Sequence, residues 1–221
     1  MGTEVQDRPK LTPKGARTRA RIVEAAARLI YERGVAGTTL DDVKVAAEVS
    51  GSQMYHYFPD KDELVQAVIA HQADVIADRQ RQADLGSAGG LAAWRDMVIA
   101  QARGSQGQGG CPLGSLAGQL AETGPRARAL LASGFEKWQA AIGDGLRRLH
   151  DAGHLADGTD PDALAVTLLA TLQGGLLLAQ VQRDARPLQT AVGTLLELVR
   201  ISCPDAPAGT GTPGSQISAG N

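Results

Sequence analysis

The fold is decided by Thr39-Leu-Asp-Asp-Val-Lys-Val-Ala-Ala-Glu-Val-Ser-Gly-Ser-Gln-Met-Tyr-His-Tyr-Phe58, a stretch that predicts two short helices joined by a tight turn. Thr39 is a good N-cap, and Asp42 lies three residues later, where its carboxylate can return a hydrogen bond to the helix start. The first helix is expected from Leu40 to about Ala47, with Glu48-Val49-Ser50 as the turn. The stretch therefore predicts a helix-turn-helix, with polar residues where nucleic acid would lie.

The second helix of this pair is expected to run from its cap, Ser50, to about Tyr57. Met54 and Phe58 are four residues apart and would anchor the helix inward. The outer side is then short, polar and aromatic, and it carries Ser52, Gln53, Tyr55 and His56. These side chains are available for contacts outside the domain.

Gln53 is the predicted base reader on this outer side. A glutamine can offer a bidentate hydrogen-bond pattern to adenine, worth about 1–3 kcal/mol against the wrong base. Ser52 could contact either phosphate or base. Tyr55 could instead be a core aromatic residue, but Gly51, four residues before it, offers no hydrophobic partner.

The segment from Thr39 to Leu64 resembles the DNA-binding domain of the TetR family of transcriptional regulators. It contains the run Val-Ser-x-x-x-Met-Tyr-His-Tyr-Phe-Pro-x-Lys-x-Glu-Leu. The resemblance implies that the second helix enters the major groove, that Tyr55 and His56 touch backbone and base edges, and that Lys61 meets a phosphate. The sequence departs from the family pattern at positions 51–53, where the family more often has a basic residue, Gly and Thr.

Basic residues gather near the start of a chain whose formal net charge is only −2. Five Lys and Arg residues lie between positions 10 and 21 without an intervening Asp or Glu, which predicts a local cationic patch; a solvated charged face is the alternative. A long helix is expected from Thr12 or Pro13 to Arg33, and its N-terminal arginines could reach phosphates flanking the groove. The full set of predicted DNA contacts is Arg17, Arg19, Thr39, Ser50, Ser52, Gln53, Tyr55, His56 and Lys61.

The composition indicates an all-α protein. Of the 221 residues, 43% are hydrophobic but only 3% aromatic, and strand-favouring runs are scarce while Ala and Leu abound. The expected organisation is a disordered basic arm (1–12), the helix-turn-helix domain (13–59), a connecting helix (60–85), a regulatory and dimerisation domain (86–202) and a disordered tail (203–221). The glycine cluster at 86–90 marks the boundary between the two domains.

Several kinds of site are not expected from the sequence. The two cysteines, Cys111 and Cys203, do not form a Cys-x-x-Cys pair, so neither a zinc site nor a disulfide framework is indicated, which suits a reducing cytoplasm. The glycine-rich segment 104–110 lacks the Gly-Lys-Ser/Thr ending of a phosphate loop. We therefore expect no metal, no cofactor and no enzymatic activity.

The regulatory domain is predicted to hold a cavity for a lipophilic or planar aromatic effector, although such a stripe is often plain core. Its helices are expected at about 91–103, 125–150, 163–181 and 187–201, after a connecting helix that runs from Asp60 to about Arg81. The segment 109–117 resembles the LmrA/YxaF-like branch of the TetR family, in which Cys-Pro opens a helix of this domain. The predicted pocket residues are Trp94, Met97, Leu113, Leu116, Phe135, Trp138 and Gln173.

The helix expected at 163–181 is apolar almost all round, so it must be covered on every side. Its length approaches a membrane span, but Thr and Gln residues interrupt it, so we expect no membrane insertion. A homodimer with a four-helix interface would cover it, and the family resemblance implies the same. The predicted interface is Leu168, Leu172, Leu176, Leu195, Leu196 and Val199.

These features together predict a cytoplasmic, ligand-responsive repressor that binds double-stranded DNA as a homodimer. A two-fold dimer should address a palindrome whose half-sites lie about 34 Å, or a multiple of it, apart. One alternative is a thiol-based redox regulator acting through Cys111, whose position near a helix start would favour the thiolate. Another is a helical dimeric interaction module without DNA binding.

Overall fold

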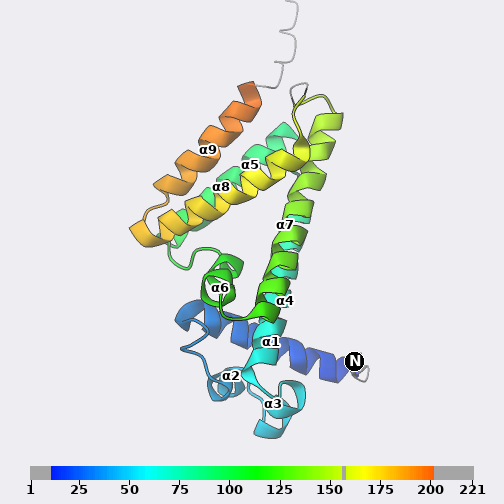
Figure 1. Ribbon diagram of the computed structural model, residues 1–221, viewed down its shortest axis with the longest axis vertical. Helices are drawn as coiled ribbons and strands as arrows, with labels where there is room; N and C mark the ends of the chain where they lie inside the picture. The colour runs from blue at the N-terminus through cyan, green and yellow to red at the C-terminus, as the bar shows by residue number, and fades with distance from the viewer. Residues whose placement is uncertain (1–10, 156–157, 202–221) are drawn as a thin grey trace, which may run out of the picture.

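The computed structural model describes residues 11–155 and 158–201, and all regular structure in that part of the chain is helical (Figure 1). The prediction of an all-α fold is therefore confirmed. The helices are α1 (Pro13–Arg33), α2 (Leu40–Ala46), α3 (Gly51–Tyr57), α4 (Lys61–Gln82), α5 (Ala88–Gly104), α6 (Pro112–Leu120), α7 (Pro125–Asp151), α8 (Pro161–Gln182) and α9 (Arg186–Ile201). The predicted basic arm falls almost entirely, and the predicted tail entirely, outside the described residues.

The N-terminal unit consists of α1, α2 and α3 gathered around the start of α4 (Figure 1). Its core contains Ile22 and Ala26 of α1, Val43 of α2, and Met54 with Phe58 at the end of α3, all of them fully buried. The four-residue spacing of Met54 and Phe58 predicted that these two residues face inward. The helix-turn-helix therefore has its own apolar support.

The long helix α4 joins this unit to the rest of the molecule. It begins after Asp60, whose side chain accepts a hydrogen bond from the Glu63 N–H at 2.8 Å. Its first half packs against α1, and α7 runs beside it over much of its length (Figure 1). Any shift of α4 relative to α7 would therefore be passed to the N-terminal unit.

Helix α5 begins at Ala88, three residues earlier than the sequence suggested. Two of the predicted boundary glycines, Gly89 and Gly90, lie in its first turn, where the Ser87 side chain caps the helix by accepting from the Gly90 N–H at 3.0 Å. A Cβ at Gly90 would lie 1.8 Å from the Asp84 carbonyl oxygen. Gly90 is thus explained by a close backbone approach rather than by a flexible linker.

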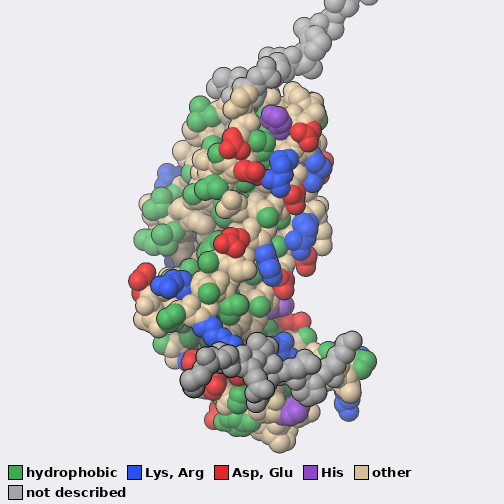
Figure 2. All heavy atoms as spheres, turned by 45° about the vertical axis from the view of Figure 1, so that its right-hand side comes forward, with side chains coloured by type: hydrophobic (Ala, Val, Ile, Leu, Met, Phe, Trp, Pro, Cys, Tyr) green, Lys and Arg blue, Asp and Glu red, His purple; other side chains and the backbone are tan. Residues whose placement is uncertain are grey.

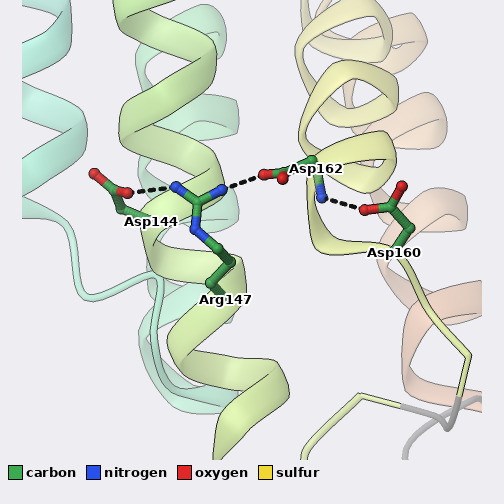
Figure 3. A network of polar contacts seen from close by, with 4 residues as sticks. All are labelled: Asp144, Arg147, Asp160 and Asp162. Carbon is green, nitrogen blue, oxygen red and sulfur yellow. Dashed lines mark hydrogen bonds and ion pairs between the residues drawn. The ribbon is translucent and has the colours of Figure 1, made fainter.

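A polar cluster links α7 to the start of α8 (Figure 3). Arg147 of α7 lies between Asp144, at 2.5 Å, and Asp162 of α8. Asp160, the N-cap of α8, accepts a hydrogen bond from the Asp162 N–H at 2.9 Å. These groups are largely exposed, so their main effect is to orient α8, with a small contribution to stability.

Helix α8 packs against α7 on one side and α9 on another. It buries Ala165, Leu168 and Leu172, whereas Leu177 and Val181 are exposed. Among the described helices, α8 is the one long and apolar enough to cross a membrane by length and composition. Water-soluble proteins use helices of this kind in cores and in subunit interfaces.

Candidate nucleic-acid interface and effector cavity

Helix α3 presents the predicted outer side chains to solvent. Ser52, Gln53, Tyr55 and His56 are exposed, with Tyr55 at 54% of its full accessible surface. Met54 and Phe58, on the opposite side, are completely buried. This pattern excludes the core-aromatic interpretation of Tyr55. A helix so anchored presents a rigid polar surface to a partner.

Both short helices are closed by reciprocal capping boxes. The Thr39 side chain accepts from the Asp42 N–H at 3.1 Å, while the Thr39 N–H donates to the Asp42 carboxylate at 2.9 Å. The Thr39 hydroxyl also donates to that carboxylate at 2.6 Å, and these hydrogen bonds hold the pKa of Asp42 below its ordinary value. The capping pair predicted from the sequence is therefore present, and the Thr39 hydroxyl proton is already engaged.

Gln53 takes part in the second capping box. The Ser50 N–H donates to Gln53 Oε1 at 3.0 Å, and Ser50 Oγ accepts from the Gln53 N–H at 3.2 Å. Ser50 Oγ and Ser52 Oγ lie 3.0 Å apart and share a hydrogen bond. Sequence reasoning treated Gln53 as free to pair with adenine, but its carbonyl oxygen already caps α3. A bidentate contact with adenine would have to use the second lone pair of this oxygen or open the capping hydrogen bond.

The turn between α2 and α3 is a strained element of this site. Glu48 has φ of 51°, a left-handed conformation that costs a residue with a Cβ free energy. Its carbonyl oxygen accepts a hydrogen bond from Arg21 Nη2 at 3.5 Å. Arg21 of α1 therefore helps to hold the turn.

The predicted phosphate-binding residues Arg17, Arg19 and Lys61 differ in exposure and in their contacts with this motif. Arg17 is exposed on α1, and Lys61 is half-buried at the first position of α4. The Arg19 guanidinium lies 5.1 Å from the ring centroid of Phe58, so its cation–π contact joins α1 to the end of α3. On the face drawn in Figure 2, basic side chains in the upper part of the molecule are mixed with acidic ones.

A cavity of about 160 Å³ lies in the second domain among α4, α5, α7, α8 and the segment that precedes α6. Tyr31, in the last turn of α1, also lines it. The lining residues are Tyr31, Ile76, Arg79, Gln80, Met97, Val98, Gln101, Ala102, Ser105, Gly107, Gln108, Gly110, Cys111, Pro112, Trp138, Leu172, Leu176 and Ala179.

Only part of the predicted pocket lines this cavity. Met97 and Trp138 do, whereas Leu113, Leu116 and Trp94 are buried elsewhere in the core. Phe135 and Gln173 do not line the cavity but contact residues that do. Phe135 stacks on Trp138, with ring planes 8° apart, and Gln173 donates a hydrogen bond to the Cys111 sulfur. The predicted set includes core residues because apolar character alone does not distinguish a residue that lines a cavity from one packed in the core.

The glycine-rich segment before α6 forms one wall of the cavity. Gly107 and Gly110 have φ of 69° and 61°, and a Cβ on Gly107 would lie 2.3 Å from the Ala179 carbonyl oxygen. The segment therefore lies directly on α8. A phosphate loop had been excluded, but the glycines did mark a place of close backbone approach, which is the signal that could have located the cavity.

Two ionisable groups of the cavity lining, Cys111 and Tyr31, stay neutral. Burial raises the pKa of the Cys111 thiol, and hydrogen bonds from the Gly114 N–H at 3.3 Å and from Gln173 only partly oppose this. Burial, followed by the nearby Cys111, raises the pKa of Tyr31. The Cys-Pro pair does open a helix, as expected, since the Cys111 sulfur caps α6. Burial of the thiol nevertheless disfavours the thiolate expected there.

The predicted dimer residues lie mainly on the inner sides of their helices. Leu168, Leu172 and Leu196 are buried within one chain, and Leu176 and Leu195 are partly buried. The side chain of Val199 lies outside the described residues. Leu172 and Leu176 line the cavity instead, so the exposed apolar surface of α8 has other members, namely Val166, Leu177, Leu178 and Val181.

The fold and the outward α3 define a helix-turn-helix transcriptional regulator, and two family models match it. Residues 22–68 match "Bacterial regulatory proteins, tetR family", and residues 89–195 match "Tetracyclin repressor-like, C-terminal domain". An uncharacterized HTH-type transcriptional regulator of Mycobacterium tuberculosis is 30% identical over 196 residues, covering 85% of this chain and 96% of that protein. The chain therefore belongs to the TetR family of DNA-binding regulators.

Other relatives agree with this assignment. The transcriptional regulator AcuR of Cereibacter sphaeroides is 28% identical, covering 85% of this chain and 87% of AcuR. The HTH-type transcriptional repressor DhaR of a Mycobacterium species is 25% identical, covering 81% and 90%. The crystal structure of regulatory protein TetR from Rhodobacter sphaeroides superposes with a TM-score of 0.72 at 25% identity, covering 81% of this chain and 97% of that one.

Proposed function

We propose that this chain is a cytoplasmic repressor that binds a palindromic operator as a homodimer and is released by a small lipophilic or aromatic effector. The observation that carries the proposal is the position of the cavity. Its lining includes Tyr31 of α1 and three residues of α4, the two helices that support the helix-turn-helix. A molecule in the cavity would therefore touch the supports of the DNA-reading helix directly.

For the DNA contacts, we propose that α3 enters the major groove. Ser52, Tyr55 and His56 are exposed on its outer side, and Arg17 and Lys61 flank it. Because phosphate contacts position a protein while base contacts select sequence, the two cations are assigned to positioning. Thr39 and Ser50 act through their caps, which hold α2 and α3 at the groove.

For the homodimer, we propose that the exposed apolar side of α8 forms the interface with α9. Leu177 and Val181 lie four residues apart on this side and are 60% and 73% exposed. Large exposed apolar groups at helical spacing are typical of a subunit interface. The exposed glycine Gly174 on the same helix would allow the two copies to approach closely.

For release, we propose that effector binding shifts α1 and α4 together. Gln119 of α6 accepts a hydrogen bond from the Val35 N–H at 2.8 Å, which links the second domain to the chain two residues after the end of α1. A ligand changes affinity for DNA only by preferring one arrangement of these helices over another. DhaR, a relative at 25% identity, is described as a repressor, which supports repression rather than activation by this chain. The Cys-Pro opening of α6 supports the LmrA/YxaF-like branch.

The decisive experiment is selection of bound sequences from a random DNA pool with the purified protein. The expected result is a palindrome with half-sites about 34 Å or a multiple of it apart, bound with steep salt dependence. A halved palindrome that binds equally well would count against the dimer. Failure to enrich any sequence would favour the helical interaction module without DNA binding.

The redox alternative has less support. The Cys111 thiol is 8% exposed, and its raised pKa keeps it protonated at neutral pH. A Cys111→Ser variant should therefore bind operator DNA like the unmodified protein, with and without peroxide. A loss of peroxide response in that variant would revive the alternative.

A further inference from the structure

Two polar side-chain atoms beside the cavity have no hydrogen-bond partner among the described residues. They are Oε1 of Gln80, on α4, and Nε1 of Trp138, on α7. Both residues line the cavity and are deeply buried, with 7% and 4% of their surface exposed. One atom is a hydrogen-bond acceptor and the other a donor.

Buried polar atoms of this kind are normally paired, because leaving water without a new partner costs free energy. Trp94 Nε1 is also buried and unpaired, but Trp94 does not line the cavity. Gln80 and Trp138 differ from it because both residues line the cavity, so a molecule there could supply the missing partners once a side-chain movement uncovers these two enclosed atoms. Their position points to a ligand that is apolar apart from a donor and an acceptor.

The size and walls of the cavity narrow the class of ligand. A volume of about 160 Å³ is close to that of an engineered apolar cavity, roughly 150 Å³, that binds benzene. Ile76, Leu172 and Leu176 supply apolar walls. Arg79 is the charged residue of the lining, and it is exposed at the rim. Buried Cys111 and Tyr31, which is 41% exposed, both stay neutral, so a charged ligand would lose hydration without a counter-charge inside the cavity.

We propose that the cavity binds an uncharged, hydroxyl-bearing monocyclic aromatic compound of the phenol class. Its ring fills the apolar volume. Its hydroxyl group donates a hydrogen bond to Gln80 Oε1 and accepts one from Trp138 Nε1. This inference rests on the proposed function for its regulatory meaning, since it names the effector class of that cavity.

The first test compares three probes of nearly equal size, namely phenol, toluene and benzoate, by titration calorimetry or ligand-observed NMR with the full chain and no DNA. Phenol is expected to bind about tenfold more tightly than toluene, as one satisfied buried hydrogen bond would give. Benzoate is expected to bind less well than phenol. Equal or tighter binding of toluene would overturn the proposal, and tightest binding of benzoate would show that Arg79 selects an anion instead.

The second test uses Gln80→Met and Trp138→Phe, with Trp94→Phe as the matched control. Because the amide oxygen of Gln80 has no partner, Gln80→Met should leave the thermal midpoint of the free protein unchanged or higher. Each cavity variant should lose part of the preference for phenol over toluene, because each removes one of the two hydrogen bonds, while Trp94→Phe keeps the full preference. Retention of the preference in both cavity variants would refute the assignment, and a lowered midpoint in Gln80→Met alone would mark that side chain as structural.

Operator binding is measured separately with the selected DNA. If phenol binds with the expected preference but does not change operator affinity, the ligand class stands and the proposed release mechanism fails. If the protein binds a palindrome but no probe shows the preference, the ligand class fails and the DNA-binding function stands.

Discussion

Truncation of Leu177 tests the proposed subunit interface quantitatively. Leu177 is 60% exposed in one chain. Burying a whole leucine side chain stabilises by about 1.5–3 kcal/mol, so covering the exposed part contributes about 1–2 kcal/mol. Leu177→Ala keeps the Cβ and should therefore cost about 1 kcal/mol per chain. A two-fold interface contains the residue twice, so the dimer should weaken by about 2 kcal/mol, or roughly 30-fold in Kd.

The assay is sedimentation or light scattering over a dilution series, without DNA. Val45→Ala is the matched control, because Val45 is 73% exposed but lies on α2, in the N-terminal unit far from α8. The control should dimerise like the unmodified protein. If Leu177→Ala dimerises with unchanged Kd and an unchanged helical spectrum, the exposed side of α8 does not form the interface and the reasoning fails.

Three further predictions concern the N-terminal unit and its link to the cavity. Gly109→Ala should destabilise the protein and weaken the binding of any effector, because the φ of Gly109 is 84° and a Cβ there would lie 1.7 Å from the Tyr31 hydroxyl. Thermal melts would measure the first effect and calorimetry the second. Thr39→Val should cost about 1 kcal/mol in denaturant unfolding at pH 7, as typical for loss of an N-cap. The pKa of Asp42 is lowered in the folded state by its hydrogen bonds with Thr39, so this stabilisation is present above about pH 4 and lost as pH falls further. Thr39→Val should thus reduce the fall in unfolding free energy below about pH 4. An unchanged pH dependence would contradict the role of the Thr39–Asp42 hydrogen bonds. Glu48→Gly should leave stability unchanged or raise it by up to about 1 kcal/mol, because it relieves a left-handed Cβ; a clear loss would show that the Glu48 side chain itself stabilises the turn.

Local sequence signals predicted the helical framework well. Helix α1 runs from Pro13 to Arg33, as expected from the sequence. The caps at Thr39 and Ser50 were also predictable, because capping chemistry depends on residues only three positions apart. Such signals are contained within one turn of helix, so they do not depend on the packing of distant segments.

The cavity and the interface were harder to predict for a different reason. Tyr31 and Gln80 reach the cavity from helices that were assigned to the DNA-binding and connecting segments, and only tertiary packing brings them together. In α8, apolar residues occur on nearly every side, so periodicity could not tell inward Leu172 from outward Leu177. The sequence therefore left open which side of α8 is exposed, and the interface proposed on that side stays a prediction.

The capping role of Gln53 has a consequence for how this regulator could change its target. If α3 enters the major groove as proposed, a substitution that removes the side-chain oxygen of Gln53 would alter the closure of α3 and the groove contact together. Operator preference and the stability of α3 would then change together. Gln53→Glu could still accept the Ser50 N–H, so it should separate a changed base preference from a frayed helix.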